Sequence, residues 1–188
     1  MAKVTVSPET FNLVFFEAPE IQKVAERVAD LVGLPADTEI QINVDERIPL
    51  GRIKTTSLKP IVLEVEGGAF EDAKRPRRLS DDATSEILAR VLFRAKDRLG
   101  GDFGDAPPDD ELSLQQQTAW IAYAAGRAER LGIPVKKPRW LYHFRNRHGF
   151  SDTADQAFAR LWSTDNLTWA DLEKACAETA AARESATA

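Results

Sequence analysis

The clearest structural signal lies in residues 39–66, EIQINVDERIPLGRIKTTSLKPIVLEVE, in which apolar side chains recur at every second position near both ends. The alternating positions are Ile40, Ile42 and Val44 near its start, and Ile61, Leu63 and Val65 near its end. A period of two predicts strands that bury one face. A third strand is expected between them, around Arg52 to Thr56. Because the links are too short for helical crossovers, these strands should pair mostly antiparallel.

The residues before this stretch predict further strands and one helix. Val4 and Val6 alternate with polar neighbours, and the apolar run 11–16 indicates another short strand. Pro19 stands where a helix can begin, and Gly33 stands where a left-handed cap can end it. The apolar face of this helix is predicted to be Ile21, Val24, Val28 and Leu31.

The second half of the chain has the pattern of helices throughout. Four polar residues stand where they can cap helix starts, namely Ser80, Ser113, Ser151 and Thr168. Ser113 with Gln116, and Thr168 with Asp171, have the spacing of capping boxes. We therefore expect an α+β fold: a small, mostly antiparallel sheet in the N-terminal half covered by helices, with a helical C-terminal half packed on it.

Length and composition are those of one globular domain. A chain of 188 residues with 43% hydrophobic and 29% charged residues can bury a sizeable core without a staple. We expect a single domain over 1–182, made of an α+β half (1–100), an acidic Gly/Pro loop (101–112) and a helical half (113–182). Residues 183–188 are expected to form a frayed tail.

Charge and cysteine content limit the classes of function. The net charge of −5 argues against bulk affinity for nucleic acid, so such a role would need a local basic patch. The single cysteine, Cys176, fits a reducing compartment. No run of residues has the length of a signal peptide or of a membrane span, so the expected location is cytoplasmic, without membrane partners.

The usual signatures of chemistry are missing from the sequence. Soft metal ligands are limited to His143, His148 and Cys176, and histidines five apart splay on a helix, so no metal is expected. Cys176 lies among alanines, where a small core thiol is the simplest interpretation. No nucleophile elbow, P-loop or dinucleotide fingerprint occurs, so we expect no cofactor. The acidic residues of the loop 102–111 are better explained by a following helix N-terminus than by a calcium site.

The order of helix, small sheet and helix resembles that of compact zinc metallopeptidases. Their helix carries His-Glu-x-x-His, in which two histidines hold the metal and the glutamate activates water. Here Ser85 and Ala89 stand at the histidine positions, and only Glu86 remains. A relative of this kind could not hold its metal, and we assign no family on one glutamate.

The segment 136–148 (KKPRWLYHFRNRH) is the strongest functional feature. It holds five Lys or Arg residues and both histidines, and it has no acidic residue. On a helix begun by Pro138, residues 139, 143 and 147 share one face. The candidate binding residues are Lys136, Lys137, Arg139, Tyr142, His143, Asn146 and Arg147. The plainer interpretation is that these arginines pair with acidic residues of the protein's own surface.

Two functional hypotheses follow from these patterns. The first is a non-enzymatic binding or regulatory module whose segment 136–148 holds a small anion, an acidic protein or nucleic acid. The second is a hydrolase-type enzyme, or a degenerate metallopeptidase-like fold, that uses Glu86. The sequence favours the first, because it offers more residues for binding than for catalysis.

Overall fold

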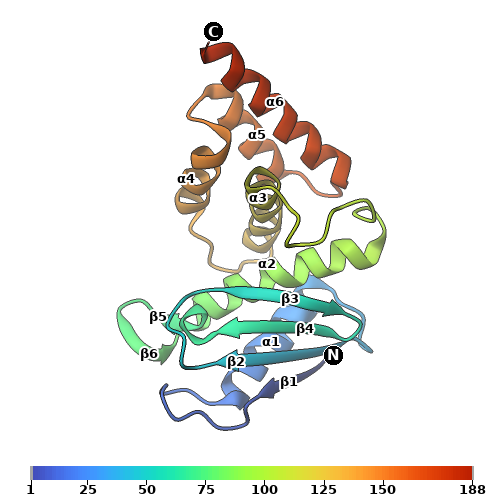
Figure 1. Ribbon diagram of the computed structural model, residues 1–188. Helices are drawn as coiled ribbons and strands as arrows, with labels where there is room; N and C mark the ends of the chain where they lie inside the picture. Colours follow the sequence, from blue (N-terminus) through green and yellow to red (C-terminus); the bar gives the residue numbers. More distant parts are fainter. Residues whose placement is uncertain (1, 188) are drawn as a thin grey trace. The chain divides into compact units, whose positions relative to one another are not determined.

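The computed structural model describes residues 2–187 and forms two compact units, Met1–Lys96 and Asp97–Ala188. The boundary falls inside one helix, a few residues before the loop at which the sequence predicts the division. The α+β class is confirmed, since strands gather in the first unit and helices fill the second (Figure 1). That both halves share one domain stays a prediction.

The first unit is built on a four-stranded sheet with the order β1-β2-β4-β3. The strands are β1 (Lys3–Ser7), β2 (Glu39–Asp45), β3 (Ile53–Leu58) and β4 (Ile61–Glu66). Helix α1 (Ala18–Val32) connects β1 to β2 and lies behind the sheet in Figure 1. The six alternating residues that the sequence predicts to be buried are all buried, and Ile42, Ile61 and Leu63 are completely so. The alternation therefore identifies the buried face correctly.

The expectation of a mostly antiparallel sheet is wrong. β1 pairs parallel with β2, and β2 pairs parallel with β4; only the pairing of β3 with β4 is antiparallel. The short links do exclude a helical crossover between β2 and β4, but β3 itself carries the chain back as an extended connection. Strands β2 and β4, which carry the alternating apolar residues, take the two inner places of the sheet. The Thr- and Ser-containing β3 occupies the edge.

Two local predictions in this unit also need correction. Residues 11–16 form no strand, although Val14 and Phe16 are buried while Leu13 and Phe15 point outward. One hydrogen bond, from Phe15 N–H to the Arg77 carbonyl (2.7 Å), replaces a strand ladder. Leu31 is exposed, because the buried face of α1 continues through Val32 instead. Gly33 caps α1 as predicted, with φ 74°.

A short hairpin and the start of α2 complete the first unit. Strands β5 (Glu71–Asp72) and β6 (Arg75–Leu79) pair antiparallel, after a short 3-10 helix η1 (Gly67–Ala69). Helix α2 (Asp81–Gly100) begins where predicted, because the Ser80 hydroxyl accepts from Ala83 N–H at 3.2 Å.

The second unit is helical, as predicted. Its helices are α3 (Leu114–Arg130), α4 (Lys137–His148), α5 (Asp152–Ser163) and α6 (Trp169–Thr187). The capping boxes of Ser113 with Gln116 and of Thr168 with Asp171 are both present. Helix α6 continues to Thr187, where the sequence predicts a frayed tail from 183; residue 188 lies outside the described residues.

Aromatic packing and one glycine hold this unit together. Trp120 of α3 is fully buried and stacks on Phe103 of the acidic loop at 4.8 Å. Arg98 anchors the same loop through the Asp109 carboxylate at 2.8 Å. Gly126 lets α3 approach α5, because a Cβ there would lie 2.1 Å from the Trp162 carbonyl oxygen. No described helix is both long and apolar enough to cross a bilayer.

Candidate functional site

Helix α4 places its residues on two distinct sides. Phe144 and His148 are completely buried, and Trp140 and Leu141 are half-buried against the helical core. On the opposite side, Arg139, His143 and Arg147 follow one another at intervals of four residues, and all three are exposed. The sequence therefore predicts the orientation of this helix correctly.

We call the exposed side the α4 basic face, defined by Lys136, Arg139, Tyr142, His143, Asn146 and Arg147, all of which are exposed. Lys137 was predicted to join this group, but it is directed elsewhere. Its Nζ lies 5.5 Å from the centroid of the Trp162 ring in α5. Six of the seven predicted residues are thus brought together.

The cations of this face are not neutralised from within. Among residues 2–187, the side chains of Lys136, Arg139 and Arg147 form no ion pair. Five other arginines of the same unit do form ion pairs, namely Arg98, Arg127, Arg130, Arg145 and Arg160. Internal pairing is therefore the rule in this unit, and the α4 basic face departs from it.

Arg145 fits the plainer interpretation, in which arginines of the segment 136–148 pair with acidic residues of the protein itself. It lies on α4 but off the basic face, and its guanidinium donates to both carboxylate oxygens of Asp155 at 2.7 and 2.6 Å. Hydrogen bonding by this guanidinium holds the pKa of Asp155 below its usual range. One of the five Lys/Arg residues in the segment is thus explained by a partner inside the protein.

His148 is a structural residue that the sequence could not separate from His143. Its Nε2 lies 3.1 Å from the Gln115 carbonyl and 3.1 Å from the Thr118 hydroxyl, and its Nδ1 lies 2.8 Å from the Thr179 hydroxyl. This arrangement fits the neutral ring with the proton on Nε2. Burial lowers the pKa of His148 to about 4, so the ring stays uncharged at neutral pH.

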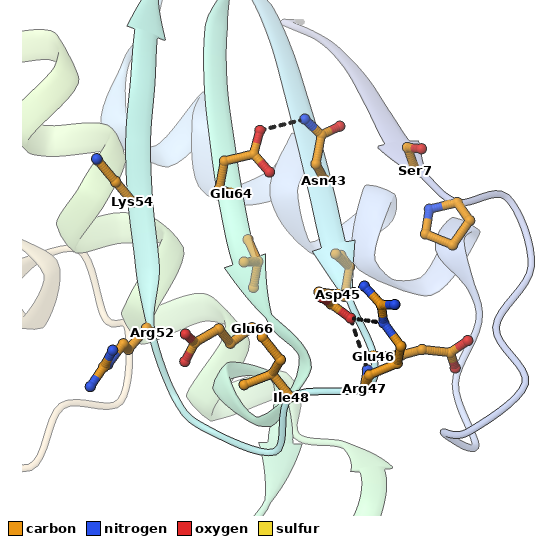
Figure 2. A pocket seen from close by; sticks show the side chains of 13 residues that line it. Ser7, Asn43, Asp45, Glu46, Arg47, Ile48, Arg52, Lys54, Glu64 and Glu66 are labelled. Atoms are coloured by element: carbon orange, nitrogen blue, oxygen red, sulfur yellow. Dashed lines mark hydrogen bonds and ion pairs between the residues drawn. The ribbon is translucent and has the colours of Figure 1, made fainter.

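A second polar site lies at the carboxyl ends of the parallel strands, where open sheets of this kind often bind ligands. It is a groove of about 680 Å³ on the polar face of the sheet (Figure 2). Asn43 and Lys54 flank Glu64 on the neighbouring strands, and Asn43 donates to Glu64 Oε1 at 2.7 Å. No pattern in the sequence predicts this groove, because its residues come from four strands and the loops beside them, in a topology that the sequence does not predict.

The next row of the groove repeats the arrangement. Asp45 pairs with Glu66 in the ladder, and Arg52 lies across from Glu66, whose N–H donates to the Arg52 carbonyl at 2.9 Å. Arg47 donates to both oxygens of Asp45 at 2.9 Å and lowers the pKa of that carboxyl. The groove therefore contains both carboxylates and cations, and it has no single sign of charge with which to select a ligand.

The residues of the hydrolase hypothesis lie apart from this groove. Ser85 is buried, and its hydroxyl accepts from the Arg27 guanidinium at 2.9 Å, while Ala89 is fully buried. Glu86 is not among the thirteen residues that line the groove. Cys176 is half-buried, and burial raises the pKa of its thiol to about 11, so it is a weak nucleophile at neutral pH.

Within residues 2–187, no three His, Cys, Asp or Glu side chains are grouped so that they could hold a metal ion. Comparison with protein-family models, with curated proteins and with solved structures finds no match to this chain. The function of this chain is therefore inferred from the geometry of these surfaces.

Proposed function

We propose that this protein is a non-enzymatic binding module that holds an anionic ligand on the α4 basic face. The observation that carries the proposal is the exposure of Lys136, Arg139 and Arg147 without an ion pair among the described residues, in a unit where five other arginines form ion pairs. Exposed cations that share one helix face attract an anion by charge and can donate hydrogen bonds to it.

The buried side of α4 supports this proposal. Phe144 stacks on His148 with ring centroids 3.8 Å apart, and His148 contacts residues of α3 and α6. Helices α3 and α6 thus hold α4 in one orientation, so the basic face is presented before a ligand arrives. A site held in advance loses less conformational entropy on binding.

The test is binding of inorganic polyphosphate to the wild type and to the double variant Arg139→Ala/Arg147→Ala. Each lost charged contact should weaken binding, so we expect the double variant to lose at least tenfold in affinity. A matched control, Arg77→Ala/Arg78→Ala, removes the same charge from an exposed strand of the other unit and should bind like wild type.

Salt supplies an independent check on the same proteins. Affinity of the wild type should fall steeply between about 50 and 200 mM salt, because anion binding to cations releases counterions. Equal affinity of wild type and double variant, or an equal loss in the matched control, would refute the proposed site.

A further inference from the structure

A row of rings runs along the α4 basic face beside its cations. Consecutive ring centroids are separated by 5.5 Å from Trp140 to His143, 6.5 Å from His143 to Tyr142, and 6.2 Å from Tyr142 to Phe150. The last ring belongs to the residue after the capping glycine of α4. Binding of a simple anion needs only cations, so the row indicates a ligand with flat apolar groups as well as negative charge.

The outer two rings are open to a ligand. Tyr142 is 58% exposed and Phe150 is 67% exposed, and their ring planes are inclined by 67°. Large exposed aromatic side chains beside cations are typical of surfaces on which nucleic-acid bases stack.

A hollow adjoins the end of this row. A pocket of about 440 Å³ is lined by Phe150, Ser151, Arg183 and the acidic Glu184, among others. The Arg183 guanidinium donates to the Arg147 carbonyl at 3.0 Å, so a further cation lies at the end of the basic face. The volume of this pocket lies in the range of sites that hold small ligands, about 300 to 1,000 Å³.

We infer that the α4 basic face binds single-stranded nucleic acid. Bases stack on Tyr142 and Phe150, and the phosphates of the same strand contact Arg139 and Arg147. The inference rests on the proposed function, since it names the anion that this face holds. Rings interleaved with cations suit a strand whose bases are free to stack.

Two other anionic partners fit these observations less well. Base pairs in a duplex are already stacked on one another, so a duplex would leave both rings without a partner. An acidic peptide would neutralise the cations but would not need the row of rings. Both are therefore used as competing probes in the test.

The experiment measures four probes by fluorescence anisotropy: a short oligothymidylate, the abasic oligomer of equal length, a duplex of equal length, and an oligoglutamate. We expect the oligothymidylate to bind at least tenfold more tightly than each of the others, because stacking on aromatic side chains adds affinity for each base. Inorganic polyphosphate serves as the common reference.

The decisive variant is Tyr142→Leu/Phe150→Leu, which removes the rings and keeps all cations. The affinity of this variant for the oligothymidylate should fall to that of the abasic oligomer, and the single variant Phe150→Leu, whose ring lies outside the α4 basic face, should keep the polyphosphate affinity of the wild type. The matched control is Phe15→Leu, since Phe15 is 70% exposed and its N–H donates to the carbonyl of Arg77, a cationic residue of β6 in the other unit. That control should bind like wild type.

The outcomes separate the two proposals. Polyphosphate binding with no preference for the oligothymidylate over its abasic form would overturn the nucleic-acid inference and leave the proposed function standing. Binding of neither would overturn both. An unchanged leucine variant, or tighter binding of duplex or oligoglutamate, would also overturn the inference. Unchanged melting temperatures confirm that each variant is folded.

Discussion

The protein has two basic regions, and they handle their charge differently. In the hairpin formed by β5 and β6, residues 73–78 are all exposed and include four cations. Two acidic residues precede them, and both act within the hairpin: Asp72 pairs with Arg75 at 2.9 Å, and Glu71 accepts from Arg77 N–H at 2.8 Å. The α4 basic face has no acidic residue between 136 and 150.

This comparison shows that the number of cations in a segment does not by itself identify a binding surface. The acidic residues of the hairpin hold its backbone in a tight conformation, including a left-handed Arg77 with φ 66°. Its charge is thus partly used by the local fold. On α4 the backbone is held by the helix and by its buried side, and Lys136, Arg139 and Arg147 form no ion pair among residues 2–187.

The largest expected effect is the difference in stability between a variant that removes an ion-paired arginine and one that removes an arginine without an ion pair. Arg127 pairs with Asp97 at 2.6 Å, and their side chains are only 12% and 7% exposed. Arg127→Ala leaves a buried carboxylate without its partner, so the free energy of unfolding should fall by about 3–5 kcal/mol. Arg139→Ala should change it by less than about 1 kcal/mol. Urea denaturation measures both, and equal losses would show that Arg139 has an internal role.

A core truncation in the sheet tests whether stability and binding can be separated. Leu63→Ala removes a fully buried side chain and should cost about 2–5 kcal/mol in unfolding free energy. The neighbouring Val62→Ala, on the half-buried side of the same strand, should cost clearly less. Polyphosphate binding by Leu63→Ala should match wild type under conditions in which it stays folded. A loss in stability below about 1 kcal/mol would contradict the assigned face.

The two histidines of α4 should respond differently to pH. Because burial lowers the pKa of His148 to about 4, the unfolded state binds a proton more readily than the folded state. Its contribution is complete above about pH 6.5 and is lost as the pH falls towards about 4, by up to about 3 kcal/mol.

The measurement is unfolding free energy over this pH range for wild type, His148→Gln and His143→Gln. Only the His148 variant should lose this part of the pH dependence. A stability profile of His148→Gln that parallels wild type would contradict the assignment.

Salt dependence should distinguish the basic regions more finely. For single strands, each phosphate contact contributes about 0.7 to the slope of log affinity against log salt. Arg139→Ala/Arg147→Ala should therefore reduce the slope for oligothymidylate by about 1.4, whereas Arg77→Ala/Arg78→Ala should leave it unchanged. A reduced salt slope in Arg77→Ala/Arg78→Ala would show that the binding surface lies in the first unit.

Metal removal should have no effect in either region. Chelation should leave the melting temperature unchanged, because metal binding that supports a fold contributes directly to its stability. Elemental analysis of protein purified without an affinity tag should find no stoichiometric transition metal. One equivalent of bound zinc would contradict this.

The sequence predicts most elements of this fold but not the sheet order. Alternation at Ile40 to Val44 and at Ile61 to Val65 identifies buried strands, and side-chain caps such as Ser113 place helix starts within a residue or two. Both are local signals. The pairing of β2 with β4 is not local, because it depends on which strand gains most from two neighbours, and nothing in residues 46–60 encodes that choice.

The candidate sites also differ in whether a local sequence pattern predicts them. The α4 basic face follows from the helical period and can be found in one segment of sequence. The separation of His143 from His148 depends on Gln115, Thr118 and Thr179, which come from two other helices. The groove at the sheet edge needs the parallel register of three strands, so no stretch of sequence points to it.

The contact at Gly126 has a consequence for the evolution of this chain. Any larger residue there would collide with the backbone of Trp162, which no change of side-chain conformation can relieve. Homologues should therefore retain glycine at this position even where their ligands differ. Arg139, Tyr142 and Phe150 are free to drift unless a ligand selects them, so invariance at these three positions would be evidence of recognition, whereas invariance of Gly126 would not.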